Sequence, residues 1–571
     1  MTYRQRGGLE TNRGVTKPCS WIFLAGCVWC LALSAVALGQ TAGGPDGIAL
    51  DEGIPVADPL VISKCGTCHA SDERGNMQRV STARTTPEGW QNVVKQMVLE
   101  HGLALTPAEA RPIVRYLSGR HGLAPAESRS VMYDPERRFY EETTTAADPL
   151  INACAKCHYI SRPLSWRRTP AEWKRFADAH AVRYKFRPSE EATAFLSRMA
   201  PLHNAEWDAW RARGALPEFT GRWLVTAALP GRGRYTGEMQ LAPAGEGEFD
   251  TRVTLISIAD GSRVQRTGHV AIYGDSAWRG RSSGRATGEP VPDNPASDAR
   301  EVLWVAPDHS TAEGRWFWGQ YQEFGFDVHL QRPAAGPSLT AVDKLSLKIG
   351  SHGNHIRILG DNLPAKLRPA DLTFGPGILL RSIVSSSAGD LVAEVDVAAD
   401  AQPGRRDIAL GGSTLSGAIA VYDRIDYLRL TPDSAMASFG DRTHPRGYQP
   451  FDAIGYQRGP DGRAHTADDI PLGPVDVTWA LEVFHSAPGS NADFVGTVTP
   501  AGLLVPAPTS PGNNFDVWVI ATARDEKDQA GKPLVGKAYV VVTIPTYSMN
   551  GRQYVRDLDR WVDIGPAVAT K

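Results

Sequence analysis

The chain has 571 residues, of which 42% are hydrophobic and 22% are charged, and its formal net charge is −2. A chain of this length is too long for a single hydrophobic core, so we expect about three to five domains. The balanced charge argues against a function that depends on overall attraction to nucleic acid or to an anionic membrane surface.

The first 39 residues have the layout of an export signal. An apolar run extends from Trp21 to Leu38, and Ala37-Leu38-Gly39 supplies the small residues that a signal peptidase requires. We predict a signal peptide over residues 1–39 and a periplasmic mature chain without a membrane span. The apolar run is close to the lower limit for crossing a bilayer, so an uncleaved anchor is the alternative. The basic residues that precede it are Arg4, Arg6, Arg13 and Lys17.

The pattern C-x-x-C-H occurs twice after this segment, at residues 65–69 and 154–158. Two thiols at this spacing can add to the two vinyl groups of one porphyrin, and the adjacent histidine is placed to ligate its iron. We therefore predict two covalently bound c-type haems. Their thiols are Cys65, Cys68, Cys154 and Cys157, and their proximal iron ligands are His69 and His158.

A C-x-x-C pair can also hold zinc or form a redox centre. A zinc site needs four ligands, and no third cysteine stands near either motif. A thioredoxin-like redox centre needs a β-α-β surround, whereas the segments around both motifs have helical patterns. The remaining cysteines, Cys19, Cys27 and Cys30, lie in the signal segment, so the mature chain has no thiol left for a disulfide.

The two motifs belong to an internal duplication. Residues 86–90 (TPEGW) recur as residues 169–173 (TPAEW), with Arg84 and Arg168 just upstream. A Thr-Pro pair is typical of a capped helix start, so each tryptophan shares a helix face with the residue seven positions later. A second helix start follows in each copy, at Thr106-Pro107 and at Arg187-Pro188.

The residues seven positions past the tryptophans are Met97 and His180, which we predict to be the distal iron ligands. A lone helical methionine often serves only for packing, so the alternatives stay open. In the first copy the rivals are His101, Met77 and Met132, and in the second copy they are Met199 and His203.

The pattern changes from helical to alternating near Leu216. Seven or eight short strands over about 115 residues predict an antiparallel barrel or sandwich, with the Trp316-Phe317-Trp318 cluster in its core and rim. Two further units have the size and strand pattern of immunoglobulin-like sandwiches. The predicted fold is thus an all-α dihaem cytochrome c domain at 40–215 (modules at about 48–125 and 135–213), a barrel at 216–335, immunoglobulin-like domains at 336–424 and 425–548, and a tail at 549–571.

The β regions contain no nucleophile elbow, phosphate loop, H-E-x-x-H motif or dinucleotide fingerprint. The acidic turn at 459–469 could hold calcium, although a solvated hairpin is the favoured interpretation. Chemistry in this chain is therefore expected at the two irons, and no residue is assigned a catalytic role.

The domain order, the motifs at Cys65 and Cys154, and the Trp90/Met97 and Trp173/His180 spacings resemble the α subunit of quinohemoprotein amine dehydrogenase. This resemblance implies a periplasmic αβγ heterotrimer with a β-propeller subunit and a small γ subunit. In that family the γ subunit carries the cysteine tryptophylquinone that oxidises primary amines to aldehydes. The present chain would then pass electrons from that quinone to a cupredoxin or a cytochrome c.

Other functions remain as alternatives. The chain could be a free dihaem carrier or the cytochrome subunit of another periplasmic dehydrogenase. A dihaem peroxidase needs an open coordination site, whereas both copies offer a sixth ligand. An adhesive or binding protein would need a binding groove in its β units. Because thioether sulfur stabilises ferrous iron, we expect the His158/His180 haem to have the lower potential and to pass electrons to the His69/Met97 haem.

Overall fold

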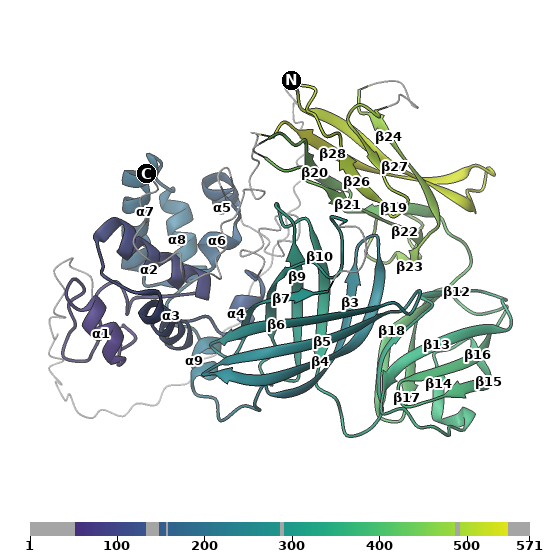
Figure 1. Ribbon diagram of the computed structural model, residues 1–571, viewed down its shortest axis with the longest axis horizontal. Coiled ribbons are helices and arrows are strands. Elements are labelled where there is room, and N and C mark those ends of the chain that lie inside the picture. The colour runs from purple at the N-terminus through teal and green to yellow at the C-terminus, as the bar shows by residue number, and fades with distance from the viewer. Residues whose placement is uncertain are drawn as a thin grey trace, which may run out of the picture. The chain divides into compact units, whose positions relative to one another are not determined.

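The computed structural model describes residues 52–132, 148–155, 158–285, 291–442, 444–485 and 492–545. Within these ranges the helices precede almost all of the strands, as Figure 1 shows. The predicted signal peptide and the tail at 549–571 lie outside the described residues. None of the described helices is both long and apolar enough to cross a membrane.

Helix starts in the first part of the chain follow the predicted caps. Thr86 accepts a hydrogen bond from the Gly89 N–H at 3.3 Å, and Thr169 caps the equivalent helix in the second copy. The helices are α1 Pro59–Cys65, α2 Pro87–His101, α3 Pro107–Arg120, α4 Pro125–Arg129, α5 Asp148–Cys154, α6 Ser161–Leu164, α7 Pro170–Tyr184, α8 Glu190–Met199 and α9 Ala205–Arg211.

One predicted helix start was misplaced. Helix α8 begins at Glu190, not at the Arg187-Pro188 pair, because the Ser189 side chain accepts from the Ala192 N–H at 3.1 Å. The cap residue therefore decides this boundary, and the proline precedes it.

The helical region also contains a short sheet, so the all-α prediction is only partly right. Strand β1 (Ala83–Thr85) pairs antiparallel with β2 (Trp166–Arg168), with Arg84 opposite Arg167. Each strand directly precedes the Thr-Pro helix of its own copy. The sheet thus joins equivalent segments of the two repeats.

Eight strands then close into an antiparallel barrel in the order β10-β3-β4-β5-β6-β7-β8-β9. Alternating side chains fill its interior, and Trp316, Phe317 and Trp318 are buried, as predicted. The strands are β3 Gly221–Leu229, β4 Gly233–Gly245, β5 Glu248–Ser257, β6 Arg263–Tyr273, β7 Ala277–Gly284, β8 Ala299–Val305, β9 Thr311–Trp318 and β10 Phe324–Gln331.

Strand β7 has few large apolar residues. Gly280 lets the strand lie close to Val270, since a Cβ there would fall 2.4 Å from Val270 Cγ1. The buried guanidinium of Arg266 donates to the Ser282 carbonyl at 2.8 Å and to its hydroxyl at 3.1 Å. Backbone approach and a buried polar side chain therefore replace apolar packing at this position.

The next unit has two four-stranded sheets, ordered β11-β13-β16-β15 and β12-β18-β17-β14, whose buried residues form one core. The immunoglobulin-like assignment stays a prediction. The elements are β11 Ser338–Val342, β12 Ser346–Lys348, β13 Asn354–Asp361, the 3₁₀ helix η2 Pro369–Asp371, β14 Leu372–Phe374, β15 Ile378–Ser386, β16 Asp390–Val397, β17 Gly404–Leu410 and β18 Ser413–Tyr422.

The last described unit has one four-stranded and two three-stranded sheets, ordered β20-β28-β27-β24, β19-β22-β23 and β21-β26-β25. In the acidic turn, the Asp469 carboxylate accepts from the Gly459 and Thr466 N–H groups. These hydrogen bonds to the backbone of the turn are typical of an aspartate that stabilises a hairpin. The strands are β19 Tyr427–Thr431, β20 Ser434–Ser438, β21 Gln449–Pro450, β22 Asp452–Gln457, β23 Ile470–Pro474, β24 Val477–Val483, β25 Gly496–Val498, β26 Leu503–Pro506, β27 Phe515–Lys527 and β28 Pro533–Thr543.

Ion pairs and packing join the first helical repeat to the barrel. Glu88 on α2 pairs with Arg279 on β7, and Arg115 on α3 pairs with Glu248 on β5. Tyr273 of the barrel packs in the core that surrounds α2 and α3. The barrel therefore supports the Trp-bearing helix of the first repeat.

Candidate haem sites

The first C-x-x-C-H motif continues helix α1 as one more helical turn. The N–H groups of Cys68 and His69 donate to the Cys65 carbonyl at 3.1 and 2.9 Å. Residues three and four positions apart on a helical turn share one face. Both thiols and the imidazole are therefore presented on the same side of the turn, as a single porphyrin requires.

His69 is half-buried, and its surroundings favour the neutral imidazole that binds iron. Burial lowers its pKa most, the charge of Arg79 lowers it further, and a hydrogen bond with the Gln78 backbone carbonyl opposes both. That hydrogen bond holds one ring nitrogen and leaves the other for a metal. The charges of His101 and Arg175 also lower this pKa, so both side chains lie near the first motif.

The described residues of the second motif, at the end of α5, have the same hydrogen bond from the histidine to the first cysteine. The backbone carbonyl of the buried Cys154 accepts from the His158 N–H at 3.3 Å. The Nδ1 of His158 lies 2.8 Å from the Tyr159 carbonyl oxygen. As in the first motif, one ring nitrogen is held by a backbone carbonyl. Cys157 lies outside the described residues.

The distal candidates of the first repeat fall into two groups. Met97 is half-buried and His101 is exposed, and they lie one turn apart on α2. Met77 and Met132 are buried at 0% and 7% exposure, and Met77 packs within the core around Trp90. The two residues on α2 are therefore the accessible candidates of this repeat.

In the second repeat, His180 has the setting of a held ligand. Its Nδ1 lies 2.7 Å from the Phe186 carbonyl oxygen, and its ring contacts Tyr184 at a centroid distance of 4.7 Å. His203 instead uses Nε2 to bond the Glu52 carbonyl at 2.6 Å. Met199 is 60% exposed.

The duplication extends to the hydrogen bonds of the two tryptophans. Trp90 Nε1 donates to the His121 carbonyl at 2.8 Å, and Trp173 Nε1 donates to the Ala200 carbonyl at 3.0 Å. Both indoles are buried, at 2% and 1% exposure. Each repeat thus fixes its tryptophan in the core against which the first cysteine of its own C-x-x-C-H motif packs, Cys65 or Cys154.

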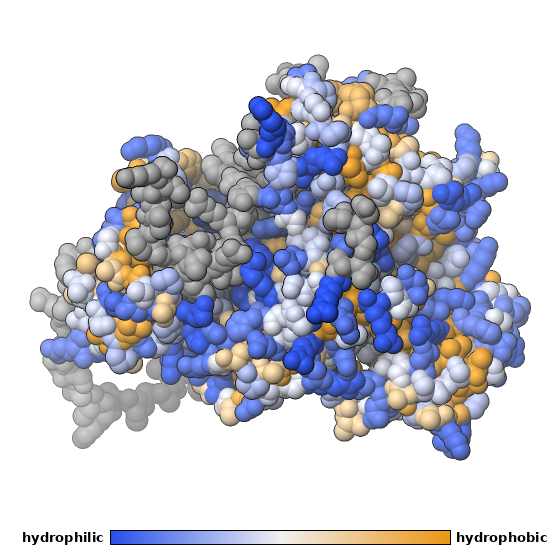
Figure 2. Space-filling model, in the orientation of Figure 1, coloured by the Kyte–Doolittle hydropathy of each residue, from blue (hydrophilic) through white to orange (hydrophobic). Residues whose placement is uncertain are grey.

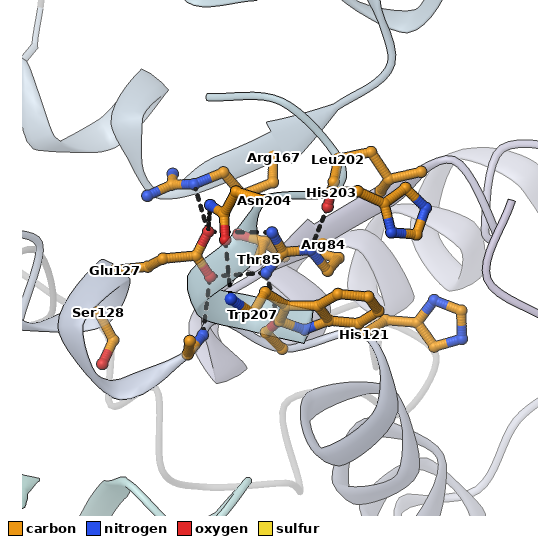
Figure 3. A network of polar contacts seen from close by, with 12 residues as sticks. Arg84, Thr85, His121, Glu127, Ser128, Arg167, Leu202, His203, Asn204 and Trp207 are labelled. Atoms are coloured by element: carbon orange, nitrogen blue, oxygen red, sulfur yellow. Dashed lines mark hydrogen bonds and ion pairs between the residues drawn. The ribbon is translucent and has the colours of Figure 1, made fainter. Parts of the chain in front are cut away.

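A buried carboxylate joins the repeats, as Figure 3 shows. Glu127 on α4 accepts from Arg84 Nη1 and Nη2 at 2.7 and 2.9 Å, and from Arg167 Nε at 3.0 Å. Asn204 Nδ2 and the Ala124 N–H also donate to it, at 2.7 and 2.8 Å. Every contact of this carboxylate shown in the figure is therefore with a hydrogen-bond donor.

The balance of burial and charge keeps Glu127 ionised. Burial raises the pKa of this carboxyl group, but the hydrogen bond from Arg84 and the charges of Arg167 and Arg84 outweigh it and lower the pKa to about 2. The Arg84 side chain has 0% exposure and that of Glu127 has 2%. The network is therefore a buried ion pair with a second guanidinium, not a surface salt bridge.

Sequence reasoning missed this network in two respects. The structural equivalent of Arg84 is Arg167, two residues before the threonine cap in each copy, whereas the pattern had matched Arg84 with Arg168. Glu127 was not singled out. Its only local signal was the third-position glutamate of a proline-started helix, where it accepts from the Ala124 N–H.

Apolar side chains accompany both motifs. Ile62 of α1 is 43% exposed, Phe186, whose ring contacts His180, is 43% exposed, and Met199 at the end of α8 is 60% exposed. On the face in Figure 2, hydrophobic patches lie over the helices at the left of Figure 1. A porphyrin has large apolar faces, so these side chains, the thiols and the held imidazoles are a donor set and a surface that fit haem.

The fold and these motifs define a large multidomain haem-binding chain, with helices first and β domains after them. Models of the quinohemoprotein amine dehydrogenase alpha subunit match most of its length: haem binding at 56–198, domain II at 217–333, domain III at 336–423 and domain IV at 428–551. The chain belongs to the quinohemoprotein amine dehydrogenase alpha-subunit family.

No curated protein matches the chain. A redesigned beta barrel bound to DFHBI shares 16% identity over 20% of this chain and 98% of its own, with a TM-score of 0.17. The Yersinia pseudotuberculosis adhesin InvE shares 13% identity over 38% of this chain and 63% of its own, with a TM-score of 0.12. Scores this low carry no argument about function.

Removing the charge of Glu127 should loosen the helical domain. We expect Glu127→Gln to lower its free energy of unfolding by about 3–5 kcal/mol at pH 7, because buried guanidinium groups lose their counter-ion. Chemical denaturation followed by haem absorbance measures this value. The control Glu313→Gln, which removes a partly exposed carboxylate 2.6 Å from Arg129, should change it by less than about 1 kcal/mol.

This difference should also depend on pH. The pKa of Glu127 is depressed in the folded chain, so its stabilisation is present above its ordinary pKa of 4.5 and is lost as the pH falls towards about 2. The gap between wild type and Glu127→Gln should narrow over that window. Equal stability of the two proteins at pH 7 would contradict the role given to this carboxylate.

Proposed function

We propose that this chain is the dihaem electron-transfer subunit of a periplasmic amine dehydrogenase. The observation that carries the proposal is the duplicated C-x-x-C-H turn, found in a chain that belongs to the amine dehydrogenase alpha-subunit family. Cys65, Cys68, Cys154 and Cys157 would hold two haems covalently. The chemistry that bound haem supplies is reversible one-electron transfer at iron.

The residues of this chain would hold and orient each iron. His69 and His158 are the proposed proximal ligands, and a backbone carbonyl fixes each ring. Met97 and His180 are the proposed distal ligands, with His101 as the rival that lies near His69. The Phe186 carbonyl, which accepts from His180, would keep that imidazole turned for ligation.

The amine chemistry would take place on a partner. Oxidation of a primary amine would reduce the cysteine tryptophylquinone of a small γ subunit, next to a β-propeller subunit. This chain would receive single electrons from that quinone and pass them to a cupredoxin or a cytochrome c. We propose that the electrons enter at the second module and leave from the first, because bis-histidine ligation lowers the potential relative to histidine–methionine ligation.

Haem content and partners can be tested on protein from the native host. The purified chain should stain for haem peroxidase activity in a denaturing gel, and a small quinone-staining subunit should co-purify in fixed ratio. Cys65→Ala/Cys68→Ala and Cys154→Ala/Cys157→Ala should each lose half of the haem per chain. A colourless band would overturn the proposal, and a lone haem-containing chain would favour a free dihaem carrier or a subunit of another dehydrogenase.

The distal ligand of the first module can be assigned by a pair of variants. Ligation by thioether sulfur gives the ferric protein a sulfur-to-iron band. We expect Met97→Ala to lose this band and His101→Ala to keep it. If Met97→Ala keeps the band, Met97 is not the ligand. A Met199→Ala variant that loses the band would then identify Met199, the rival of His180 in the second module, as the thioether ligand.

The order of the two potentials follows from the second module's ligand. His180→Met should raise the potential of that haem, because a thioether stabilises ferrous iron relative to imidazole. Spectroelectrochemical titration measures both potentials in one sample. An unchanged lower potential in this variant would show that His180 does not ligate iron.

A further inference from the structure

Trp166 on β2 packs against the cores of both haem modules. Its half-buried indole contacts the core around Trp90, which includes Cys65, and the core around Trp173, which includes Cys154. Its position on β2 explains this, because β2 belongs to the second repeat and pairs with β1 of the first.

The contacts around Trp166 link it to Trp90 directly and to Trp173 through the Arg168 guanidinium. The centroids of Trp90 and Trp166 are 6.2 Å apart, with an interplanar angle of 63°. On the other side, the guanidinium carbon of Arg168 lies 4.1 Å from the Trp166 centroid and 5.6 Å from that of Trp173. The path therefore runs between the two tryptophans that the repeats have in common.

The helices at the ends of this path are held together elsewhere as well. Glu100 near the end of α2 pairs with Arg183 near the end of α7. This ion pair thus joins the ends of the two Trp-bearing helices.

Trp166 is not part of what the two repeats share. When the repeats are aligned on their Thr-Pro caps, Ala83 stands where the second repeat has Trp166, and Thr85 stands where it has Arg168. The first repeat folds with the small residue, since Ala83 is buried beside Trp90. The bridging indole is therefore a feature of the second repeat that the first repeat lacks.

We propose that Trp166 is the electronic coupling residue between the two haem modules. One electron would leave the reduced centre of one module and enter the oxidised centre of the other by tunnelling through the Trp90–Trp166 contact and, by way of Arg168, Trp173. The indoles are neither oxidised nor reduced, so the transfer needs no further reactant. This inference rests on the proposed function, because it requires both modules to carry haem.

A pair of substitutions separates conduction from packing. Trp166→Leu keeps an apolar side chain of moderate size but removes the aromatic ring, whereas Trp166→Phe keeps a ring. Both are made in the full-length, haem-loaded chain. Rapid photoreduction of one centre, followed by absorbance at each haem, measures the rate constant of equilibration between the modules.

We expect this rate constant to fall in Trp166→Leu and to recover towards the wild-type value in Trp166→Phe. The two haem potentials should stay near wild type in both variants, and the midpoint of denaturation measures how much packing each substitution removes. Trp304→Leu is the control, because Trp304 is a partly buried indole of the barrel that bonds the Pro125 carbonyl at 2.7 Å and lies outside both haem cores.

The outcomes are distinguishable from a failure of the proposed function. If the chain carries no haem, the proposed function and this inference both fall. If both haems are bound and Trp166→Leu equilibrates at the wild-type rate, only the role of Trp166 is overturned. A fall that is equal in Trp166→Leu and Trp166→Phe, or that accompanies a shift in either potential, would assign Trp166 to positioning instead.

Discussion

The carboxylate of Glu127 is the contact on which the helical domain depends. The duplication places two equivalent arginines, Arg84 and Arg167, opposite each other at the centre of the β1–β2 pair. Two cations cannot be buried side by side without an anion, because each loses its hydration. One glutamate from α4 serves both, so the two repeats are held in a single relative position by a group that lies outside the repeated segment.

Local signals accounted for much of the fold. Thr86 and Thr169 start their helices as their sequence context predicts, because a side-chain cap satisfies backbone N–H groups only a few residues away. The C-x-x-C-H motif likewise specifies its own geometry, since all its members belong to one helical turn. The alternating strands beyond residue 216 indicated a barrel or sandwich, and the closed barrel is the outcome.

The features that could not be predicted depend on distant residues. Glu127 is 43 residues from Arg84 and 40 from Arg167, so no spacing rule connects them. Strands β1 and β2 have three residues each, which is too short for an alternation of apolar and polar residues to predict a strand. The choice between Met97 and His101 also exceeds sequence reasoning, because residues one helical turn apart face the same side. In each case the feature is decided by contacts in the folded chain that the local sequence does not contain.

The asymmetry between the repeats bears on how the two centres differ. Bis-histidine ligation in the second module would favour ferric iron. Arg168, which replaces Thr85 there, acts in the opposite sense: burial lowers its pKa to about 10, so the guanidinium remains charged at neutral pH. A carboxylate oxygen of Glu172 lies 3.9 Å from this guanidinium. A positive charge close to a bound haem would favour the reduced, less positive iron. If both modules hold haem as proposed, the difference in their potentials would be the balance of a ligand effect and a charge effect, and both would arise where the second repeat departs from the first.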